Sequence, residues 1–379
     1  MARVRCITMQ KNETKLLEPW IKYYGYFFGF ENLYILDNGS NENVVFEVLE
    51  KYKKAGVNVY YEYNKKEDFD KKGDIISDII HGWDSNNEPY DYVIPIDCDE
   101  FVVLCEEKIE VSREKLNSYL DSLKGIQDAF IIKKLFLNIP DDAEFFTPAV
   151  VPKSMFARDT LGHLDHGFHH PKSSKSDETH VTNLGYMHLH NKQFSEVLQA
   201  AKEKLVYYID TEDKNTLKEY TGPGLHLVEY FFMTEIEYKN KFINKASIFI
   251  PEFSFLLEAL GVELYSVFGN HQKYKKTLLQ THKGMLIRYP DTNKISYDFI
   301  DFNEKEYILN HEDLQNAPIE PLIHFSEYGY KESRKVNKIF SCSIKEFNEI
   351  YKENSPLKPG SINKNKYEAL CFSKIHNND

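Results

Sequence analysis

The chain has 379 residues, of which 42% are hydrophobic and 28% are charged, and its formal net charge is −12. This length predicts about two domains, and the composition excludes wholesale disorder. The acidic balance argues against nucleic-acid binding through phosphate neutralisation, and the sequence contains no run of about 18 apolar residues that would form a membrane-spanning helix.

The first residues, MARVRCITMQ, lack the apolar stretch of a signal peptide. Five cysteines are scattered along the chain without the spacing of a metal site. We therefore expect a cytoplasmic protein whose thiols are reduced.

Apolar, strand-like runs alternate with helical spacing through the first hundred residues. The runs cover residues 4–9, 33–36, 57–61 and 92–96, and amphipathic stripes between them predict helices that begin near residues 16, 44 and 75. Strands that alternate with helices in this way predict an α/β fold with a mixed, mainly parallel sheet flanked by helices.

The pattern is less regular after residue 103. We expect a helix over 112–123, strands over 130–139 and 150–156, a structured His-rich loop over 158–191 and a helix over 194–209. The strongest break, Gly222-Pro223-Gly224, predicts a first domain over residues 1–222, with halves 1–105 and 106–222, and a smaller, partly helical C-terminal domain over 223–379. The polar tail from Lys358 is expected to be loosely held.

Polar side chains gather where three of the expected strands end. They are Lys11, Asn12 and Glu13 after the first strand, Asp37 and Asn38 after the second, and Asp97 and Asp99 after the fourth. Ligands of parallel α/β sheets bind beyond the carboxyl ends of the strands, so these residues predict one shared site. Two carboxylates two residues apart suit Mg²⁺ or Mn²⁺, although an isolated D-x-D is also typical of a solvated turn.

Four ordered motifs connect these residues to a known family. They read K-N-E at 11–13, W-I-K-Y-Y-G-Y-F-F-G-F at 20–30, L-Y-I-L-D-N-G-S at 33–40 and I-P-I-D-C-D-E-F at 94–101. Together they resemble the family 2-like glycosyltransferases with a GT-A (Rossmann-like) fold, in the branch with D-N-G-S after the second strand and a D-x-D-E-F metal motif. The match is ordered over residues 1–105 and continues weakly at 153–156 and in M-H-L-H at 187–190.

The resemblance implies a nucleotide-sugar donor, with a UDP-sugar as the default, and Mn²⁺ or Mg²⁺ on its diphosphate. The implied metal ligands are Asp97, Asp99 and His188. The residues implied to line the nucleoside pocket are Lys11, Asn12, Glu13, Asp37 and Asn38. From the residues alone, Asp37 is equally well explained as a turn residue, and Glu13 as an acid at a helix N-terminus.

Seven of the 14 histidines lie between residues 163 and 190. His188 matches a family histidine, but Leu189 follows it where related enzymes have an aromatic residue. The series His163, His166 and His169 has the residue types of a zinc site but lacks a helical H-E-x-x-H pattern. A surface loop with solvated histidines is the second interpretation of this segment.

Family 2-like enzymes are expected to invert the anomeric centre, which requires a general base. We predict Asp165, within G-H-L-D-H-G, as this base. Asp141, Asp142, Asp159, His166 and His169 are rival candidates for the same role. Lys71 and Lys72 lie in a charged run that is ordinarily a solvated loop, although a lysine there could instead neutralise phosphate.

The sequence therefore predicts a metal-dependent, inverting glycosyltransferase that acts on a glycan or lipid-linked glycan acceptor. By resemblance it would serve polysaccharide biosynthesis in the cytoplasm, with peripheral contact at the inner face of the membrane left open, and without nucleic acid. Two further functions fit the D-x-D motif: a haloacid-dehalogenase-like phosphatase or phosphotransferase with Asp97 as nucleophile, and a non-catalytic sugar-binding protein. The phosphatase is disfavoured because those enzymes carry the motif on their first strand.

Overall fold

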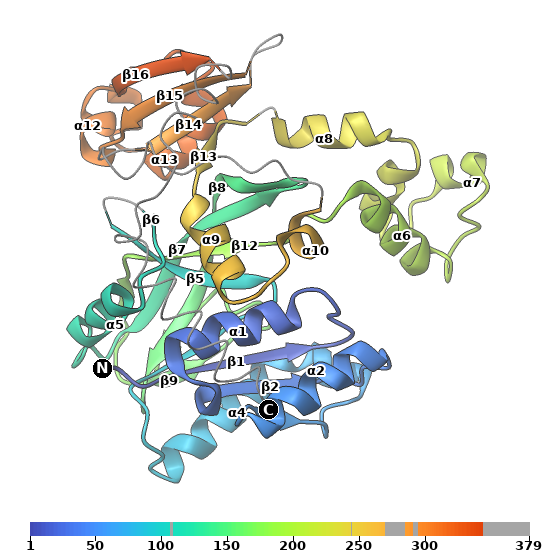
Figure 1. Ribbon diagram of the computed structural model, residues 1–379, viewed down its shortest axis with the longest axis vertical. Helices are drawn as coiled ribbons and strands as arrows, with labels where there is room; N and C mark the ends of the chain where they lie inside the picture. The colour runs from blue at the N-terminus through green and yellow to red at the C-terminus, as the bar shows by residue number, and fades with distance from the viewer. Residues whose placement is uncertain (107–108, 244, 270–284, 291–294, 344–379) are drawn as a thin grey trace.

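The structure is a computed structural model that describes residues 1–106, 109–243, 245–269, 285–290 and 295–343 (Figure 1). A mixed sheet runs through the described part of the chain, and helices cover its faces. Of the helices described, none combines the length and the apolar character that crossing a bilayer requires. The polar tail predicted from Lys358 onwards lies outside the described residues.

The first hundred residues form the parallel part of the sheet, in the spatial order β3-β2-β1-β4. The strands are β1 (Val4–Gln10), β2 (Leu33–Asp37), β3 (Asn58–Tyr60) and β4 (Tyr92–Pro95). The helices are α1 (Leu17–Phe28), η1 (Phe30–Asn32), α2 (Asn43–Lys54), α3 (Lys66–Asp70) and α4 (Lys72–Ser85). The predicted α/β class, with a parallel central sheet flanked by helices, is confirmed.

Both faces of this parallel sheet are buried. Alternate residues of a strand point to opposite faces, so Cys6 packs in the same cluster as Trp20 of α1, whereas Ile7 packs in the cluster of Ile80 on α4. Burial on both sides explains the nearly continuous apolar runs of these strands.

Beyond β4 the sheet continues mainly through antiparallel pairs. The further strands of this region are β5 (Glu100–Cys105), β6 (Ile109–Glu110), β7 (Ala129–Ile139), β8 (Asp142–Ala157), β11 (Thr179–Val181) and β12 (Leu184–His188). Beside them lie the helix α5 (Arg113–Ser122) and a separate two-stranded sheet of β9 (Leu161–His163) and β10 (Lys172–Ser173). Strand β12 lies between β5 and β7. It and strands β9, β10 and β11 fall inside the segment 158–191 predicted as a loop, so that prediction is wrong for these four strands.

A group of helices projects from the sheet (Figure 1). It contains α6 (Phe194–Leu205), α7 (Lys214–Glu219), η2 (Leu225–Phe231) and α8 (Glu235–Ile243). We call residues 192–243 the helical lobe. The lobe has a small core of Leu205, Leu217 and Val228. Ion pairs connect it to the rest of the molecule, from Glu196 to Lys15 and from Lys239 to Asp141.

The chain then returns to the sheet. Strand β13 (Ser247–Phe249) pairs with β8, and helices α9 (Pro251–Ala259) and α10 (Leu264–Phe268) pack in the same core as α1. The remaining elements are β14 (Met285–Pro290), β15 (Ile295–Asp301), α12 (Glu304–Leu309), η3 (Glu312–Leu314), α13 (Pro321–His324), η4 (Phe325–Gly329) and β16 (Asn337–Ser343). Division of the chain at residue 222 stays a prediction. Strand β13, which follows residue 222, pairs with β8 and so extends the sheet of the first part.

Candidate active site at the carboxyl edge of the parallel sheet

The carboxyl ends of three parallel strands meet at one edge of the sheet. Gln10, the last residue of β1, pairs with Asp37, the last residue of β2. Strand β4 runs parallel to β1 on its other side, and Asp97 follows this strand. The polar clusters that the sequence places after these strands therefore lie along the same edge, where α/β sheets bind ligands.

Asp97 is held between two lysine side chains. Its Oδ1 accepts a hydrogen bond from Lys72 Nζ at 2.8 Å, and its Oδ2 accepts one from Lys153 Nζ at 3.0 Å. The two lysine side chains are only 5% and 3% exposed. Burial would raise the pKa of Asp97, but the Lys153 and Lys72 ammonium groups outweigh burial and lower this pKa to about 2. Asp97 is therefore ionised at neutral pH.

Lys153 connects Asp97 to Glu100. Its Nζ lies 2.9 Å from Glu100 Oε1 and also donates to the carbonyl oxygen of Gly167 at 3.0 Å. These contacts, with Asp97, match the three N–H bonds of an ammonium group. Burial raises the pKa of Glu100 to about 7, although Lys153 acts in the opposite direction. Glu100 is thus a buried carboxyl group whose charge depends on its neighbours.

Phe168 packs against both lysines. The centroid of its ring lies 4.5 Å from Lys72 Nζ and 5.4 Å from Lys153 Nζ, within the range of cation–π attraction. Phe168 is fully buried, and its φ of 62° lies in the left-handed region that bulky residues rarely adopt. Its carbonyl oxygen accepts a hydrogen bond from Ser154 Oγ at 2.7 Å, which helps to hold this strained conformation.

Asp99 lies beside two histidines from the end of β12. The Nε2 atom of His188 is 3.2 Å from Asp99 Oδ2, and His190 completes a group whose ligand atoms all lie within 4.8 Å of one another. Burial would lower the pKa of His188, but its hydrogen bond with Asp99 outweighs burial and raises this pKa. Burial and the neighbouring His188 lower the pKa of His190. Within the described residues this is the only cluster of three such side chains that could hold a metal.

This donor set fits a divalent cation. One carboxylate and two neutral imidazoles can ligate Mn²⁺ and the heavier first-row metals, and they suit Mg²⁺ less well. The negative charges of Asp97 and Asp99 already match the positive charges of Lys72 and Lys153. A diphosphate would therefore require additional positive charge, which a cation could supply.

Asp97 is not among the three residues of this cluster, and its role as a metal ligand stays a prediction. The predicted set of Asp97, Asp99 and His188 differs from the observed cluster of Asp99, His188 and His190. The physical reason is that both carboxylate oxygens of Asp97 already accept hydrogen bonds from lysine. The geometry therefore assigns Asp97 the task of holding the two lysines together.

Asp37 and Asn38 are buried and their side chains bond within the protein. The Asp37 carboxylate accepts hydrogen bonds from Gln10 Nε2 at 2.5 Å and from the hydroxyl and amide of Ser40, at 2.5 and 3.0 Å. Asn38 Nδ2 donates to the carbonyl oxygens of Tyr63 and Lys65, each at 2.8 Å. These contacts shape the edge of the site, and they favour the turn interpretation of Asp37 over nucleoside binding.

In the segment after β1, two side chains accept hydrogen bonds from the backbone and one is exposed. Asn12 has a φ of 54°, and its side-chain oxygen accepts the N–H groups of Asn41 and Glu42 at the start of α2. Glu13 Oε1 accepts the N–H groups of residues 15 and 16, at 3.2 and 3.0 Å, at the N-terminus of α1. Lys11 is exposed. Glu13 thus makes the contacts of an acid at a helix N-terminus, which is one of the two interpretations of its sequence position. It also lines the cavity described below.

Asp165 lies in the loop beside Lys72 and Lys153. Its carboxylate accepts the backbone N–H groups of Gly167 at 3.2 Å and of His169 and His170, each at 2.7 Å. Burial would raise the pKa of Asp165, but these backbone hydrogen bonds outweigh burial and lower it. A carboxylate engaged by three donors is a weaker proton acceptor, so this geometry favours a loop-stabilising role over the predicted role of general base.

Among the rival candidates for the base, Asp159 lies at the opposite edge of the sheet. The N–H of its neighbour Arg158 bonds to the carbonyl oxygen of Asp91, which precedes β4, whereas Asp97 follows that strand. Asp159 is therefore remote from the ends where the polar clusters gather.

The remaining candidate bases are engaged elsewhere. Asp141 pairs with Lys239 at 2.8 Å, and Asp142 pairs with Arg288 at 2.7 Å. The ring of His166 packs on Phe69, and His169 Nδ1 lies 2.7 Å from the carbonyl oxygen of Pro152. His163, His166 and His169 are all described, and the zinc site considered for them does not form.

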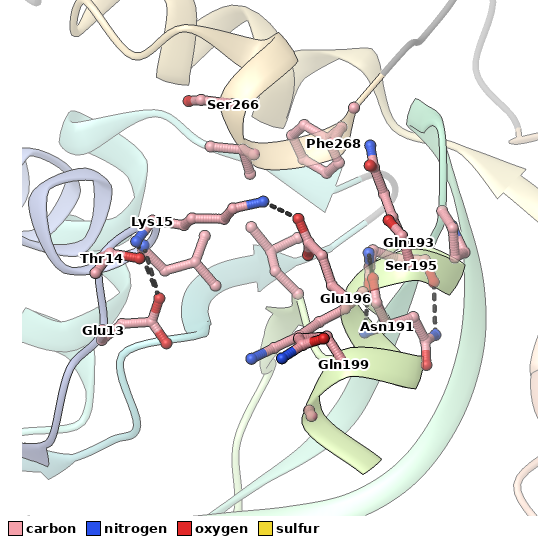
Figure 2. A pocket seen from close by; sticks show the side chains of 18 of the residues that line it. Glu13, Thr14, Lys15, Asn191, Gln193, Ser195, Glu196, Gln199, Ser266 and Phe268 are labelled. Carbon is pink, nitrogen blue, oxygen red and sulfur yellow. Dashed lines mark hydrogen bonds and ion pairs between the residues drawn. The ribbon is translucent and has the colours of Figure 1, made fainter. Parts of the chain in front are cut away.

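A cavity of about 370 Å³ opens beside the two histidines. Leu189, which lies between them in the chain, belongs to its wall, and the Leu189 N–H donates to the carbonyl oxygen of Asp99 at 2.8 Å. The other walls come from residues 12–16, from α6 and from the end of α10. Figure 2 shows the ion pair of Lys15 and Glu196 at this cavity. The described residues that line the cavity thus include Glu13 and Leu189, whereas Asp99, His188 and His190 are not among them.

Sequence patterns do not single out Lys153, Glu100 or His190. Lys153 and His190 reach Asp97 and Asp99 only because β8 and β12 pair with earlier strands, and nothing in their local sequence signals this pairing. The weak motif matches at 153–156 and 187–190 are the only sequence signals for both residues.

No family model matches the chain, and no curated protein matches it. Among solved structures, the chain is similar to residues 1–349 of S. aureus TarS in complex with UDP, at 11% identity over 77% of this chain and 98% of that chain, with a TM-score of 0.30. It is also similar to a cytidylyltransferase from Leptospira borgpetersenii serovar Hardjo-bovis, at 13% identity over 64% of this chain and 96% of that chain, with a TM-score of 0.26. These likenesses are too distant to assign either activity to this chain.

Proposed function

We propose that this protein is a metal-dependent glycosyltransferase that moves a sugar from a nucleotide diphosphate to the hydroxyl group of an acceptor. The observation that carries the proposal is the cluster of Asp99, His188 and His190, whose ligand atoms lie within 4.8 Å of one another at the ligand-binding edge of a parallel sheet. A cavity whose wall includes Leu189, the residue between the two histidines, provides room for a substrate.

Asp99, His188 and His190 are the residues that would hold the cation. A cation bound there would stabilise the negative charge that develops on the departing diphosphate. Two imidazole ligands favour Mn²⁺ over Mg²⁺, so we propose Mn²⁺ as the ion. Lys72 and Lys153, held by Asp97, form a buried support for the edge on the α4 side.

The transfer would proceed by direct displacement with inversion. The oxygen of the acceptor hydroxyl forms a bond to the anomeric carbon, the bond from that carbon to the diphosphate oxygen breaks, and the electron pair leaves with the diphosphate. The hydroxyl proton passes to a carboxylate base. We propose Glu13 as this base instead of Asp165, because Glu13 lines the cavity and both of its backbone hydrogen bonds go to Oε1, whereas both carboxylate oxygens of Asp165 accept backbone N–H groups.

A uridine nucleotide is the first donor to test, since the four ordered motifs imply a UDP-sugar as the default donor. Lys11 would border the nucleotide, while Asp37 and Asn38 would shape the pocket through the loops that they hold. A glycan or lipid-linked glycan of a surface polysaccharide remains the proposed acceptor class.

The test is thermal unfolding with UDP and other nucleoside diphosphates, each with and without Mn²⁺. A ligand at 100 times its dissociation constant adds about 2.7 kcal/mol of stability, so a rise in Tm is expected that requires both nucleotide and metal. Asp99→Asn and His190→Ala should lose the metal-dependent part. Glu13→Gln should keep the shift in Tm but lower sugar transfer by roughly 10²- to 10⁴-fold, as expected for loss of a general base.

The same proteins separate the competing functions. A phosphatase that uses Asp97 as nucleophile would release phosphate from phosphate esters, and Asp97→Asn would abolish this release. A non-catalytic sugar-binding protein would bind without turnover. Absence of any nucleotide-dependent shift in the native protein would rule out the transferase.

A further inference from the structure

The cavity beside Leu189 has a chemical character of its own. Side-chain amides and hydroxyls are spread over its walls, contributed by Thr14, Asn191, Gln193, Ser195, Gln199 and Ser266. Amides and hydroxyls both donate and accept hydrogen bonds, as do the hydroxyl groups of a sugar. Figure 2 shows several of these side chains around the cavity, from α6, α10 and the segment before α1.

Charge at the cavity disfavours an anionic ligand. Three carboxylates, Glu13, Glu196 and Glu203, lie in the wall with two lysines, Lys15 and Lys192. Lys15 is already paired with Glu196. A phosphate group entering this cavity would meet a net negative wall, and juxtaposed like charges weaken binding.

The cavity also lies on a defined side of the site. Its wall residues Leu16, Leu189 and Phe268 belong to the apolar cluster that covers one face of the sheet, together with α1. Phe168, which packs against Lys72 and Lys153, belongs to the cluster on the other face, with α4. The cavity and the buried pair of Lys72 and Lys153 therefore lie toward opposite faces of the sheet.

We propose that this cavity binds the acceptor, and that the acceptor is an uncharged, hydroxyl-rich saccharide unit and not a phosphate-bearing one. This assignment rests on the proposed function for the meaning of "acceptor", but the binding site itself can be tested separately. The nucleotide diphosphate would bind at the proposed cation, outside this cavity.

The test is ligand-observed saturation-transfer NMR with the full chain and no nucleotide or metal. The probes are the methyl glycosides of glucose, galactose and N-acetylglucosamine, and glucose 6-phosphate is the charged probe. We expect saturation transfer to at least one methyl glycoside, and roughly tenfold weaker binding of glucose 6-phosphate because of the acidic wall.

Two substitutions place the binding in the cavity. Ser195→Trp fills the cavity and should abolish the saccharide signal, whereas Ser122→Trp, a matched change at the exposed end of α5, should leave the signal unchanged. Gln199→Leu replaces the amide with an apolar group of similar size and should weaken the signal several-fold. This second variant keeps the proposal testable if Ser195→Trp fails to fold.

The proposal is overturned if no methyl glycoside gives a signal, if both cavity substitutions leave the signal intact, or if glucose 6-phosphate binds as well as the uncharged probes. Because these measurements contain no nucleotide, their outcome is distinct from that of the nucleotide experiment. A saccharide signal without any nucleotide shift would retain the saccharide site and reject the transferase.

Discussion

At the scale of single residues, Lys153 has the most consequential environment. Its ammonium group is nearly fully buried and contacts the carboxylates of Asp97 and Glu100. Removing one partner of a buried ion pair leaves uncompensated charge in a medium of low dielectric constant. Asp97 would then keep only Lys72 as a partner, and Glu100 would become neutral.

We expect Lys153→Met to lower the free energy of unfolding by about 3 kcal/mol, measured by denaturant titration at neutral pH. Protonation of Glu100 limits the loss, since the pKa of this group is already raised to about 7. Lys124→Met is the control, because Lys124 pairs with Asp121 at the surface and its loss should hardly change stability. Equal effects of the two substitutions would contradict the buried network.

Asp165 offers a pH-dependent test of its structural role. Burial opposes its ionisation, but backbone N–H groups lower its folded-state pKa, so it stabilises the fold above its ordinary pKa of about 3.9. This contribution is lost as the pH falls through the folded-state value. Asp165→Asn should therefore cost about 1 kcal/mol at pH 7, a modest value because the group is partly exposed.

The difference in unfolding free energy between the native protein and Asp165→Asn should narrow as the pH falls below about 3.9. Denaturant titrations at pH 7 and at pH 3 measure this. A difference that stays constant with pH would mean that the charge of Asp165 does not stabilise its loop, and loss of sugar transfer without loss of stability would restore Asp165 as the base.

At the scale of elements, β12 depends on a close backbone approach. A Cβ atom at Gly185 would lie 2.6 Å from Cys105 Sγ on β5 and 2.9 Å from the carbonyl oxygen of Lys134 on β7. We expect Gly185→Ala to destabilise the protein by about 1–3 kcal/mol through overpacking. Because β12 ends at His188, the substitution should also weaken the Mn²⁺-dependent rise in Tm.

Gly82→Ala is the matched control in helix α4. A Cβ atom there meets nothing within 4 Å, and alanine is the better helix former, so stability should rise by up to about 1 kcal/mol. Thermal unfolding of the two variants, with and without Mn²⁺, checks both expectations. A destabilised Gly82→Ala, or an unaffected Gly185→Ala, would contradict the described packing.

The difference between β1 and β12 explains how much of the fold the sequence predicts. Strand β1 is buried on both faces and reads as an apolar run, so its existence and direction follow from local sequence. Strand β12, L-G-Y-M-H, is short and contains a glycine that is needed only because two other strands flank it. Its burial is a product of distant pairing, which local periodicity does not encode.

The site divides in the same way. Asp97 and Asp99 are predictable because they follow an apolar strand of an alternating series. His190 and Lys153 are less predictable from the sequence. His190 follows β12 and Lys153 lies on β8, and both reach the edge through strand pairing alone. Side-chain partners also escape prediction, and the two lysines on Asp97 are the clearest example.

At the scale of the whole molecule, the helical lobe projects from the described part of the sheet and has only a small apolar cluster of its own. Its own apolar cluster comprises Leu205, Leu217 and Val228, and its side chains Tyr207 and Tyr208 are 84% and 61% exposed. Small cores and exposed segments open locally at low free-energy cost, which makes them susceptible to proteases.

We expect chymotrypsin, under native conditions, to cut the described part of the chain first after Tyr207 or Tyr208. Mass spectrometry of the fragments identifies the position, and Tyr207→Ser combined with Tyr208→Ser should suppress these cuts. A saccharide bound in the cavity should slow the cuts, since α6 forms part of the cavity wall. First cuts within β7 or β8 would contradict this order of stability.

The position of β12 also has a consequence during synthesis of the chain. Asp99 and His188 are 89 residues apart, and at about 5–20 residues per second a ribosome needs roughly 4–18 seconds to add the second after the first. Until then the nascent chain carries the aspartate without its imidazole partners. The cation site therefore forms only after β12 has been synthesised and has paired with β5, so a shorter growing chain would not capture metal, and occupancy of the site would report that this pairing has taken place.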